Sequence, residues 1–556
     1  MLGVLFFILP SISSSSDFHP LLTSPPGLPG VKLIVHNRGL AYLNQISSNV
    51  LASNLPRLVI PDVQQRLNND QGVININNIR VSRFRRAEQQ LITTSPLNRL
   101  SWKMRNLDLG FIGDLSGMVN IVIPFNLTGQ AEILAEGLTF HLDSSIEKSV
   151  NGSGHVTSLY CVTTIRNVHV TNHNGGLFGL AVDVFKEGVS NNVRQLLQEL
   201  ICKKVRSYID LELNAKLSEA QTKSPLAEAV ETNALRSTKL PSGVSVLSLF
   251  SQELGKHFFI DFRLKEDPKC GVNDVELSSA GEISPQGTGN TPFGPSTMVW
   301  PVSPVLQQDE PSMISLLVSD FLPNSLFYHA FKQGYTRLLL TAETPGVAPF
   351  LRTTCDGAFC IADLVPQLGD TYPNSSIELL LSATRAPAIL FSEKNGGTIS
   401  TSLVGTAVVY AVTGNVNRKQ VAVIDVEVVA DAQLSLMDHT VNGNVQLTKF
   451  LLKNRLTSTT ISDADLADIS LLVSQLLENM INEMLSNGFP LPIPHVLKLN
   501  KTRISVHARR LLIRTDVLVD ERTVSRLAEK TIFRSPIFGT PRDPRRNITQ
   551  IMPLNG

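Results

Sequence analysis

Apolar residues recur at intervals of three and four in three segments of the chain, which predicts three amphipathic helices. The first segment runs from Gly39 to about Leu58, and its apolar face consists of Leu40, Leu43, Ile46, Val50 and Leu51. The second runs from about Ala181 to Leu217 and carries Val182, Phe185, Val189, Val193, Leu196 and Leu200. The third runs from about Ser462 to Ser486 and carries Leu466, Ile469, Val473, Leu476, Met480 and Met484.

Strand-like alternation fills the chain between these helices. Ile74 and Ile76 alternate with Asn75 and Asn77, and similar runs lie at 100–109, 119–125, 131–142 and 158–170. The second half places a short helical segment at 325–334 before runs at 338–341, 377–383, 402–412 and 421–429, with a final pair at 495–507 and 511–519. Consecutive strands separated by turn residues favour antiparallel meanders. The order of helix, meander and long helix therefore occurs twice, without a repeat at the level of residues.

A region of different character joins the two halves, from about 241 to 311. Strand-like runs at 244–250 and 258–264 open it, and a series of prolines and glycines follows from Pro285 to Pro311. Such a composition predicts an extended linker rather than a compact unit.

A long amphipathic helix can cover the apolar face of a twisted antiparallel sheet. Where the cover is partial, an elongated apolar pocket remains, and it suits acyl chains because burial stabilises by about 0.8 kcal/mol per CH2 without a directional partner. The alternative is that these helix faces are ordinary core. The candidate lipid-contacting residues are Leu43, Ile46, Val50, Val182, Phe185, Val189, Val193, Leu466, Ile469, Val473, Leu476 and Met480.

Charge and motifs exclude several classes of function. Among 556 residues, 49 Lys and Arg nearly balance 48 Asp and Glu, and charged residues make up only 17%. Nucleic-acid binding requires a basic face, so we expect no nucleic-acid partner. The sequence has no Gly-x-Ser-x-Gly elbow, Walker loop, His-Glu-x-x-His motif or EF-hand loop, and no cysteines at zinc-site spacing. These observations predict a protein that is not an enzyme and has no metal or cofactor.

The N-terminal residues 1–16 predict a signal peptide. The apolar run Leu2–Leu9 is too short to span a bilayer, and serines follow it, although no basic residues precede it. The alternative is a truncated or wrongly assigned start. Five Asn-x-Ser/Thr sequons also favour the secretory route, and we expect glycosylation at Asn126, Asn151, Asn374, Asn500 and Asn547.

The five cysteines are Cys161, Cys202, Cys270, Cys355 and Cys360. A turn at Asp356-Gly357 can bring Cys355 and Cys360 together. An oxidising compartment favours disulfides, whereas a cytosolic chain would keep five buried thiols. Cys270 is then left either free or available for an intermolecular bond.

Several short stretches, in order along residues 26–520, resemble one family. They are Pro29-Gly30-Val31 with Gly39-Leu40 and Tyr42, Ile60-Pro61-Asp62, Val168-His169-Val170, Leu317-Val318-Ser319-Asp320-Phe321 and Gly488-Phe489-Pro490-Leu491-Pro492. Cys161 and Cys202 match the position and separation of a disulfide in that family. The chain thus resembles the bactericidal/permeability-increasing, lipopolysaccharide-binding and plasma lipid transfer protein family.

The resemblance implies an α+β fold of boomerang shape, in which two tandem barrels of twisted antiparallel sheet with long helices are joined by a central sheet. We expect an N-terminal barrel at 26–240, central strands and a proline-rich linker at 241–311, and a C-terminal barrel at 312–520. It also implies a Cys161–Cys202 disulfide and one phospholipid in an apolar pocket of each barrel. The expected partners are phospholipid or another amphipathic lipid, with lipopolysaccharide or a membrane surface as further candidates.

The sequence departs from the family at three places, and the Cys355/Cys360 pair is one of them. Members that bind lipopolysaccharide carry a Lys/Arg-rich tip, but the comparable loop at 113–120 has no basic residue. The remaining basic cluster, Arg80, Arg83, Arg85 and Arg86, is either a solvated strand face or a phosphate site. The tail at 521–556 holds Val524, Leu527 and Ala528 at helical spacing. We expect this tail to be disordered, with a weakly amphipathic plug as the alternative.

These observations together predict a secreted, extracellular lipid-binding protein that holds phospholipid acyl chains and transfers lipid. One alternative is an innate-immune lipopolysaccharide binder. An alternative of another class is a secreted structural or adhesive protein in which lipid is only a filler.

Overall fold

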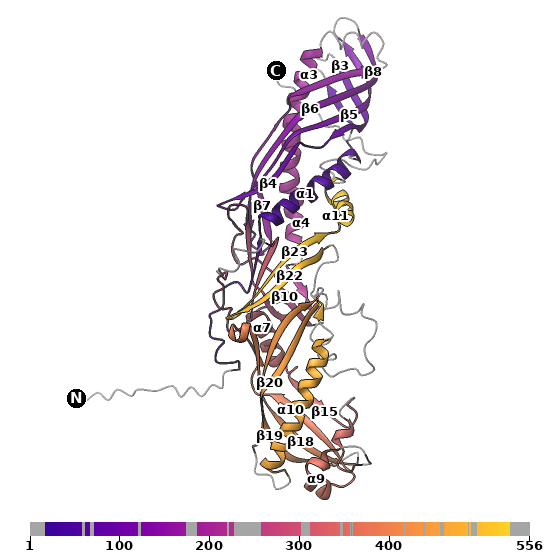
Figure 1. Ribbon diagram of the computed structural model, residues 1–556. Helices are drawn as coiled ribbons and strands as arrows, with labels where there is room; N and C mark the ends of the chain where they lie inside the picture. Colours follow the sequence, from indigo (N-terminus) through magenta and orange to yellow (C-terminus); the bar gives the residue numbers. More distant parts are fainter. Residues whose placement is uncertain are drawn as a thin grey trace, which may run out of the picture.

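The computed structural model describes residues 17–57, 60, 62–66, 72–120, 124–173, 186–219, 222–226, 257–301, 312–344, 348–355, 357, 360–414, 417–437, 440–455, 461–486, 489–490 and 497–533. The molecule is elongated, with one large antiparallel sheet at each end and a smaller sheet between them (Figure 1). The predicted fold class, two curled sheets with long helices joined by a central sheet, is confirmed.

The sheet of the first half is built from long strands that pair in sequence order. Its strands are β2 (Val63–Arg66), β3 (Gly72–Arg85), β5 (Arg99–Asn120), β6 (Pro124–Lys148) and β7 (Gly154–Thr164), with β4 (Gln89–Ser95) paired to β5 and β8 (Asn167–His173) paired to β6. Helix α1 (Asn37–Asn54) lies against β4, and α3 (Lys186–Tyr208) lies against β7 and β8. A π-helical turn, Ile209–Leu213, continues α3 into α4 (Asn214–Glu219). The first two predicted helices therefore exist close to their expected bounds.

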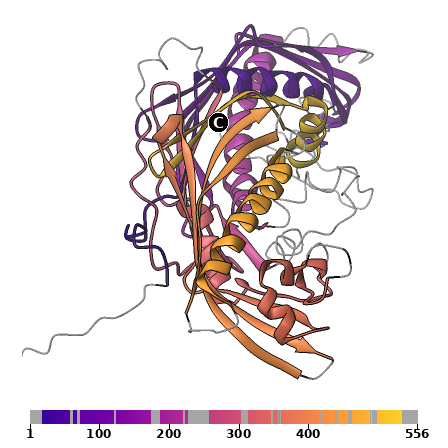
Figure 2. The same cartoon turned by 60° about the horizontal axis from the view of Figure 1, so that its bottom comes forward.

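The sheet of the second half has the same plan. Its order is β15 (Arg337–Leu340), β16 (Ser376–Ala383), β18 (Thr398–Thr413), β19 (Asn417–Met437), β20 (Thr440–Asn454) and β21 (Phe489–Pro490), with β17 (Ala388–Ser392) paired to β18. The helices are α7 (Phe321–Lys332), α8 (Ile361–Leu364), α9 (Pro366–Thr371) and α10 (Asp463–Ser486). In both views α10 runs beside the orange strands of this sheet (Figure 2). The predicted third helix is thus α10. At its start, Ser462 Oγ accepts from Asp465 N, and Asp465 Oδ2 accepts from Ser462 N.

The central sheet collects strands from distant parts of the chain. Its order is β11 (Lys269–Cys270), β12 (Val275–Ser279), β1 (Val31–Val35), β14 (Ile314–Ser319), β23 (Arg510–Val519) and β22 (Leu497–His507). A separate three-stranded sheet contains β13 (Glu282–Pro285), β10 (Phe258–Asp261) and β9 (Lys223–Pro225). The last strand pair, assigned from sequence to the second barrel, therefore lies in the central sheet, as does β1 from the opening of the first barrel.

Two further expectations need correction. The proline-rich stretch is not a free linker where it is described, because Phe293 and Met298 are buried at 2% and 5% exposure. The tail is not disordered over 521–533, because α11 (Glu521–Ala528) and a π-helical turn, Glu529–Phe533, pack beside α1. Asp520 caps α11 by accepting from the backbone of Arg522 and Thr523. Residues 534–556, like the predicted signal peptide at 1–16 and the strand-like run at 244–250, lie outside the described residues.

Candidate functional site

In the first half, a disulfide ties the long helix to the sheet. Cys161 on β7 and Cys202 on α3 are bonded, with their Cα atoms 5.7 Å apart, so this predicted pairing is confirmed. Around it lies an apolar cluster that contains Leu138 and Phe140 of β6 and Val193 of α3. The helix is therefore held over β7 and β8 by both packing and a covalent bond.

Two apolar side chains of the same sheet, Phe111 and Leu115, lie outside this cluster. On β5, Leu109, Phe111 and Leu115 alternate on one face, and β5 pairs with β6 so that Phe111 lies opposite Ile133. Leu107, further back, is 5% exposed and Ile133 packs against the cluster, whereas Phe111 and Leu115 are half-buried and lie outside it. The apolar face of the sheet thus continues beyond the packed cluster toward the end of the molecule.

In the second half, α10 is attached to the sheet by a row of polar side chains. Asn482 Oδ1 accepts from Val445 N at 2.7 Å, and Asn482 Nδ2 donates to Val445 O at 2.9 Å. Glu478 accepts from Leu447 N at 2.9 Å, and Ser470 Oγ donates to the carbonyl of Phe450 at 2.7 Å. The helix therefore satisfies the part of the β20 edge for which the described residues provide no neighbouring strand.

The apolar face of α10 points into the same layer. Leu466 is 1% exposed and Ile469 packs beside it, against a cluster that includes Ala407 and Val409 of β18 and Ile424 of β19. The sequence missed Ser470, Glu478 and Asn482. The sequence could have predicted that they act together, because spacings of eight and four residues place all three on one face of a helix.

Here too the cluster ends before the sheet does. Strand β18 continues along the same face to Leu403, which pairs with Val428 of β19, which in turn pairs with Phe450 of β20. Val428 and Phe450 are half-buried, and Leu403 remains 37% exposed. This row of three apolar side chains lies directly beyond the packed core.

The predicted lipid-contacting residues divide into three groups. Val193, Leu466 and Ile469 lie in the helix–sheet layers, and Val473 is half-buried on α10. Of the α1 residues, Ile46 is buried, Val50 half-buried and Leu43 47% exposed, and none belongs to the cluster under α3. Val182 and Phe185 lie outside the described residues, and so do the side chains of Val189, Leu476 and Met480.

The basic cluster of the first half is partly neutralised. Arg85 donates to both carboxylate oxygens of Asp108, at 2.6 and 3.1 Å, and also pairs with Glu88. The hydrogen bond from Arg85 lowers the pKa of Asp108, and a backbone hydrogen bond from Gly137 adds to the effect. Arg86 donates to the side chain of Asn49. Both guanidinium groups thus have partners within the fold.

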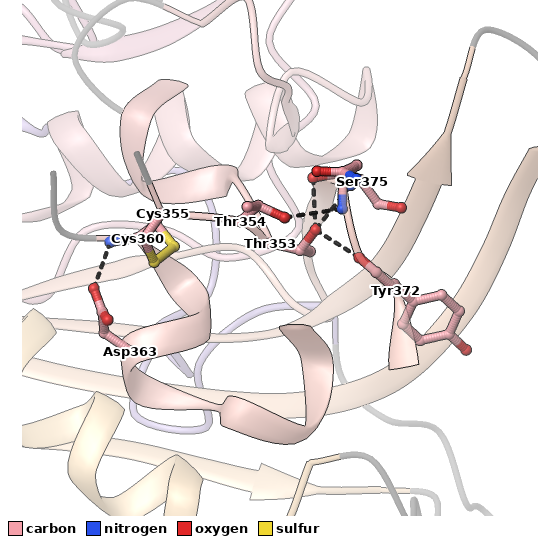
Figure 3. Close-up of a disulfide and its surroundings, with 8 residues drawn as sticks. Thr353, Thr354, Cys355, Cys360, Asp363, Tyr372 and Ser375 are labelled. Atoms are coloured by element: carbon pink, nitrogen blue, oxygen red, sulfur yellow. Dashed lines mark hydrogen bonds between the residues drawn. A yellow bond between two sulfur atoms is a disulfide. The ribbon is translucent and has the colours of Figure 1, made fainter. Parts of the chain in front are cut away.

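The second predicted disulfide is also present, between Cys355 and Cys360 (Figure 3). Cys360 precedes α8, and its backbone N–H donates to Asp363 at 3.1 Å. Asp363 is close enough to both sulfurs to suggest a metal site, but the bonded sulfurs leave only the carboxylate as a ligand. Thr353 anchors the neighbouring loop by donating to the carbonyls of Tyr372 and Ser375. Cys270 is a free buried thiol, and burial raises its pKa.

Four of the five sequons lie at exposed positions, namely Asn126, Asn151, Asn374 and Asn500, and Asn547 lies outside the described residues. The side chain of Asn151 is engaged by the fold, since its Oδ1 accepts from both the backbone and the hydroxyl of Ser153. Among the helices that the structure describes, none is both long and apolar enough to cross a membrane.

Comparison with known proteins agrees with this architecture. The LBP / BPI / CETP family matches the chain through its N-terminal domain at residues 39–218 and its C-terminal domain at residues 252–519. The chain belongs to this family. It is 22% identical to the bactericidal permeability-increasing protein of Sebastes schlegelii, over 88% of this chain and 95% of the relative.

Two relatives from Homo sapiens show comparable similarity. The lipopolysaccharide-binding protein is 22% identical over 93% of this chain and 99% of its own, and the phospholipid transfer protein is 21% identical over 88% and 90%. A crystal structure of lipopolysaccharide binding protein, 17% identical, covers 88% of this chain and 99% of its own with a TM-score of 0.49. The names of the two human relatives make the family one of lipid-binding and lipid-transfer proteins.

Proposed function

We propose that the protein is secreted and binds amphipathic lipid, with acyl chains lying between helix and sheet in each half. The observation that carries the proposal is the same in both halves. The buried cluster stops partway along the sheet, and the apolar face continues in half-buried side chains, Phe111 and Leu115 in one half and Val428 and Phe450 in the other. Such a surface gains stability when acyl chains cover it.

The name of the phospholipid transfer protein supports lipid as the ligand class, and the two disulfides support passage through an oxidising compartment. Binding that depends on anionic lipopolysaccharide receives less support. Arg85 and Arg86 are engaged within the fold, and 113–120 offers no basic residue. We therefore favour zwitterionic or neutral lipid, held and exchanged, over endotoxin.

Native mass spectrometry of the full chain secreted from eukaryotic cells tests the proposal. We expect masses that exceed the glycosylated protein by two phospholipids, and exchange of those lipids with labelled vesicles. Non-exchanging lipid would support the structural alternative instead, and salt-sensitive binding of lipopolysaccharide would support the immune one. A spectrum of lipid-free protein alone would contradict lipid binding altogether.

A variant that fills the apolar layer between α10 and the sheet of the second half makes the test specific. Leu403→Trp adds bulk beside Val428 and Phe450, so we expect it to lower the bound lipid from two molecules toward one. Leu97→Trp is the matched control, because Leu97 lies in an exposed turn at 85% exposure. Equal lipid content in both variants would contradict the proposal that acyl chains bind between α10 and the sheet of the second half.

A further inference from the structure

An N-terminal strap, residues 17–28, precedes both family domains and lies against the second half of the molecule. At its start the carbonyl of Asp17 accepts from Ala386 N at 2.8 Å. Further along, the carbonyl of Leu21 accepts from Arg509 Nη1 at 2.9 Å. The chain then continues into β1, so the strap connects the central sheet to the second half.

Two apolar side chains anchor this strap. Phe18 packs on Phe293, with ring centroids 5.0 Å apart, and on Tyr328 of α7, with centroids 6.2 Å apart. Leu22 is 3% exposed and lies in one cluster with Phe293 and Phe321. The strap therefore covers aromatic side chains, and its release would bring apolar surface into contact with water.

The last part of the strap approaches its neighbour too closely for a side chain. Gly294 N donates to Ser24 O at 2.7 Å, and a Cβ at Gly294 would lie only 2.2 Å from the carbonyl oxygen of Pro25. Glycine alone has no Cβ and so allows this approach. The docked strap is therefore a specific conformation rather than a loose covering.

A histidine forms the turn in the middle of the strap. The carbonyl of His19 accepts from Leu22 N at 2.9 Å, and its Nδ1 accepts from Leu21 N at 3.2 Å. Nδ1 can accept only in the neutral imidazole whose proton is on Nε2. A protonated ring carries a hydrogen on both nitrogens and loses this bond. The turn therefore favours the neutral form of His19.

The cations around His19 favour the neutral ring as well. Arg385, in the loop before β17, forms no ion pair within the described part of the chain, and Arg509 lies in the turn between β22 and β23. Burial lowers the pKa of His19, and the charges of Arg385 and Arg509 lower it further. A protonated His19 would thus be both poorly hydrated and repelled by two cations.

The acidic groups of the surrounding elements are each engaged with a basic partner. On the strap, before α7 and beside the turn between β22 and β23, these pairs are Asp17–Lys332, Asp320–Arg509 and Glu393–His507. None of these carboxylates is therefore left to neutralise a protonated His19.

From this geometry we propose that acid releases the strap, because protonation of His19 breaks its bond to Leu21 N and places a charge beside two arginines. The strap is docked at neutral pH. Docking favours the neutral ring, so docking weakens as the pH falls below about 6.5, the usual value for a free imidazole. Release uncovers the aromatic side chains where the central sheet meets the second half. The strap shares no residue with the acyl-chain layers, so the proposal is independent of the function proposed above.

Hydrogen exchange of the full chain, followed by mass spectrometry at about pH 7.5 and about pH 5.5 and corrected for the intrinsic effect of pH, tests the proposal. We expect residues 17–28 to be protected at the higher pH and to exchange at least about threefold faster at the lower pH, with β18 and β19 unchanged. His19→Gln keeps an acceptor without a titratable ring, so its strap should stay protected at both pH values. His173→Gln, at a 46% exposed side chain on β8, is the matched control and should behave like the unaltered protein.

Two further variants examine the charge and the anchors. Arg385→Gln removes a repelling cation and should reduce the effect of acid, whereas Arg337→Gln, at an exposed position of β15, should not. Phe18→Ala/Leu22→Ala removes both apolar anchors and should exchange fast at both pH values, which defines the released state.

Three results would overturn the proposal. The first is equal protection of residues 17–28 at the two pH values in the unaltered protein. The second is an effect of acid in His19→Gln as large as in His173→Gln. The third is a strap in Phe18→Ala/Leu22→Ala that is as protected as in the unaltered protein at about pH 7.5, since the anchors would then not hold it.

Discussion

Asn482 on α10 makes with Val445 on β20 both hydrogen bonds that a neighbouring strand would make, one as acceptor at 2.7 Å and one as donor at 2.9 Å. The helix thereby replaces a strand at the edge of the sheet. Glu478 and Ser470 extend the same interaction to Leu447 and Phe450. The position of α10, and with it the apolar layer beneath, thus depends on polar residues.

Replacing Asn482 with Leu should therefore loosen the second half. Both backbone groups of Val445 lose their partner, and each buried unsatisfied group costs about 1–3 kcal/mol. We expect a lower free energy of unfolding and faster amide exchange at Val445, measured by urea denaturation and hydrogen exchange. Asn479→Leu is the control on the exposed side of the same helix. Equal exchange in both variants would show that the pair does not hold the edge.

The two disulfides should contribute unequally to stability. Cys161 and Cys202 are 41 residues apart, which corresponds to about 4 kcal/mol in the chain-entropy estimate, whereas the separation of 5 between Cys355 and Cys360 corresponds to about 2 kcal/mol. We expect Cys161→Ser/Cys202→Ser to unfold at clearly lower denaturant than Cys355→Ser/Cys360→Ser. The reverse order would mean that strain or local packing outweighs loop length.

Much of this fold was accessible from sequence, for a physical reason. The helices α1, α3 and α10 each carry a long apolar stripe, and such periodicity survives without knowledge of partners. The sequence could not predict which strands form the central sheet, because Val31 of β1 pairs with Val318 of β14 and Ser279 of β12, which are far away along the chain. Short apolar runs specify a strand but not its neighbour.

The candidate site also has some features that could be predicted from the sequence and others that could not. The apolar stripe on α10 was predicted through Leu466 and Ile469, whereas the edge-closing role of Asn482 was not, since a polar residue on a helix is usually solvated. The tail was predicted to be disordered, but Asn54 of α1, 2% exposed, donates to the hydroxyl of Ser525 at 3.0 Å. A tertiary contact of this kind leaves no local pattern.

Acid should destabilise the first half through Asp108. The hydrogen bond from Arg85 lowers the pKa of Asp108 in the folded state, so its stabilisation is fully present above the unfolded pKa and is lost as the pH falls through the folded pKa. We expect Asp108→Asn to flatten the acid side of the stability profile, measured by urea unfolding between pH 2 and 6 (about the range in which carboxylates titrate). Asp425→Asn, at a surface ion pair, should leave the slope unchanged.

The docking of α11 on α1 predicts a sharp difference between two truncations. A chain that ends at Phe533 keeps the bond from Asn54 to Ser525, the bond from Asn49 to Glu521 and the contact of Lys216 with the carbonyl of Thr531. A chain that ends at Asp520 loses all three and exposes the buried amide of Asn54. We expect the shorter chain to lose about 1–3 kcal/mol of stability and to exchange faster along α1, because the three hydrogen bonds to the tail are lost and each contributes about 0.5–1.5 kcal/mol net.

The cap of α11 offers a milder version of the same test. Asp520→Ala removes the side chain that accepts from the backbone of Arg522 and Thr523, a loss of typically about 1 kcal/mol of helix stability. Hydrogen exchange by mass spectrometry should show faster exchange over 521–533 and a smaller increase over Asn37–Asn54. If the truncation at Asp520 left exchange in α1 unchanged, α11 would be a passive appendage rather than part of the folded first half.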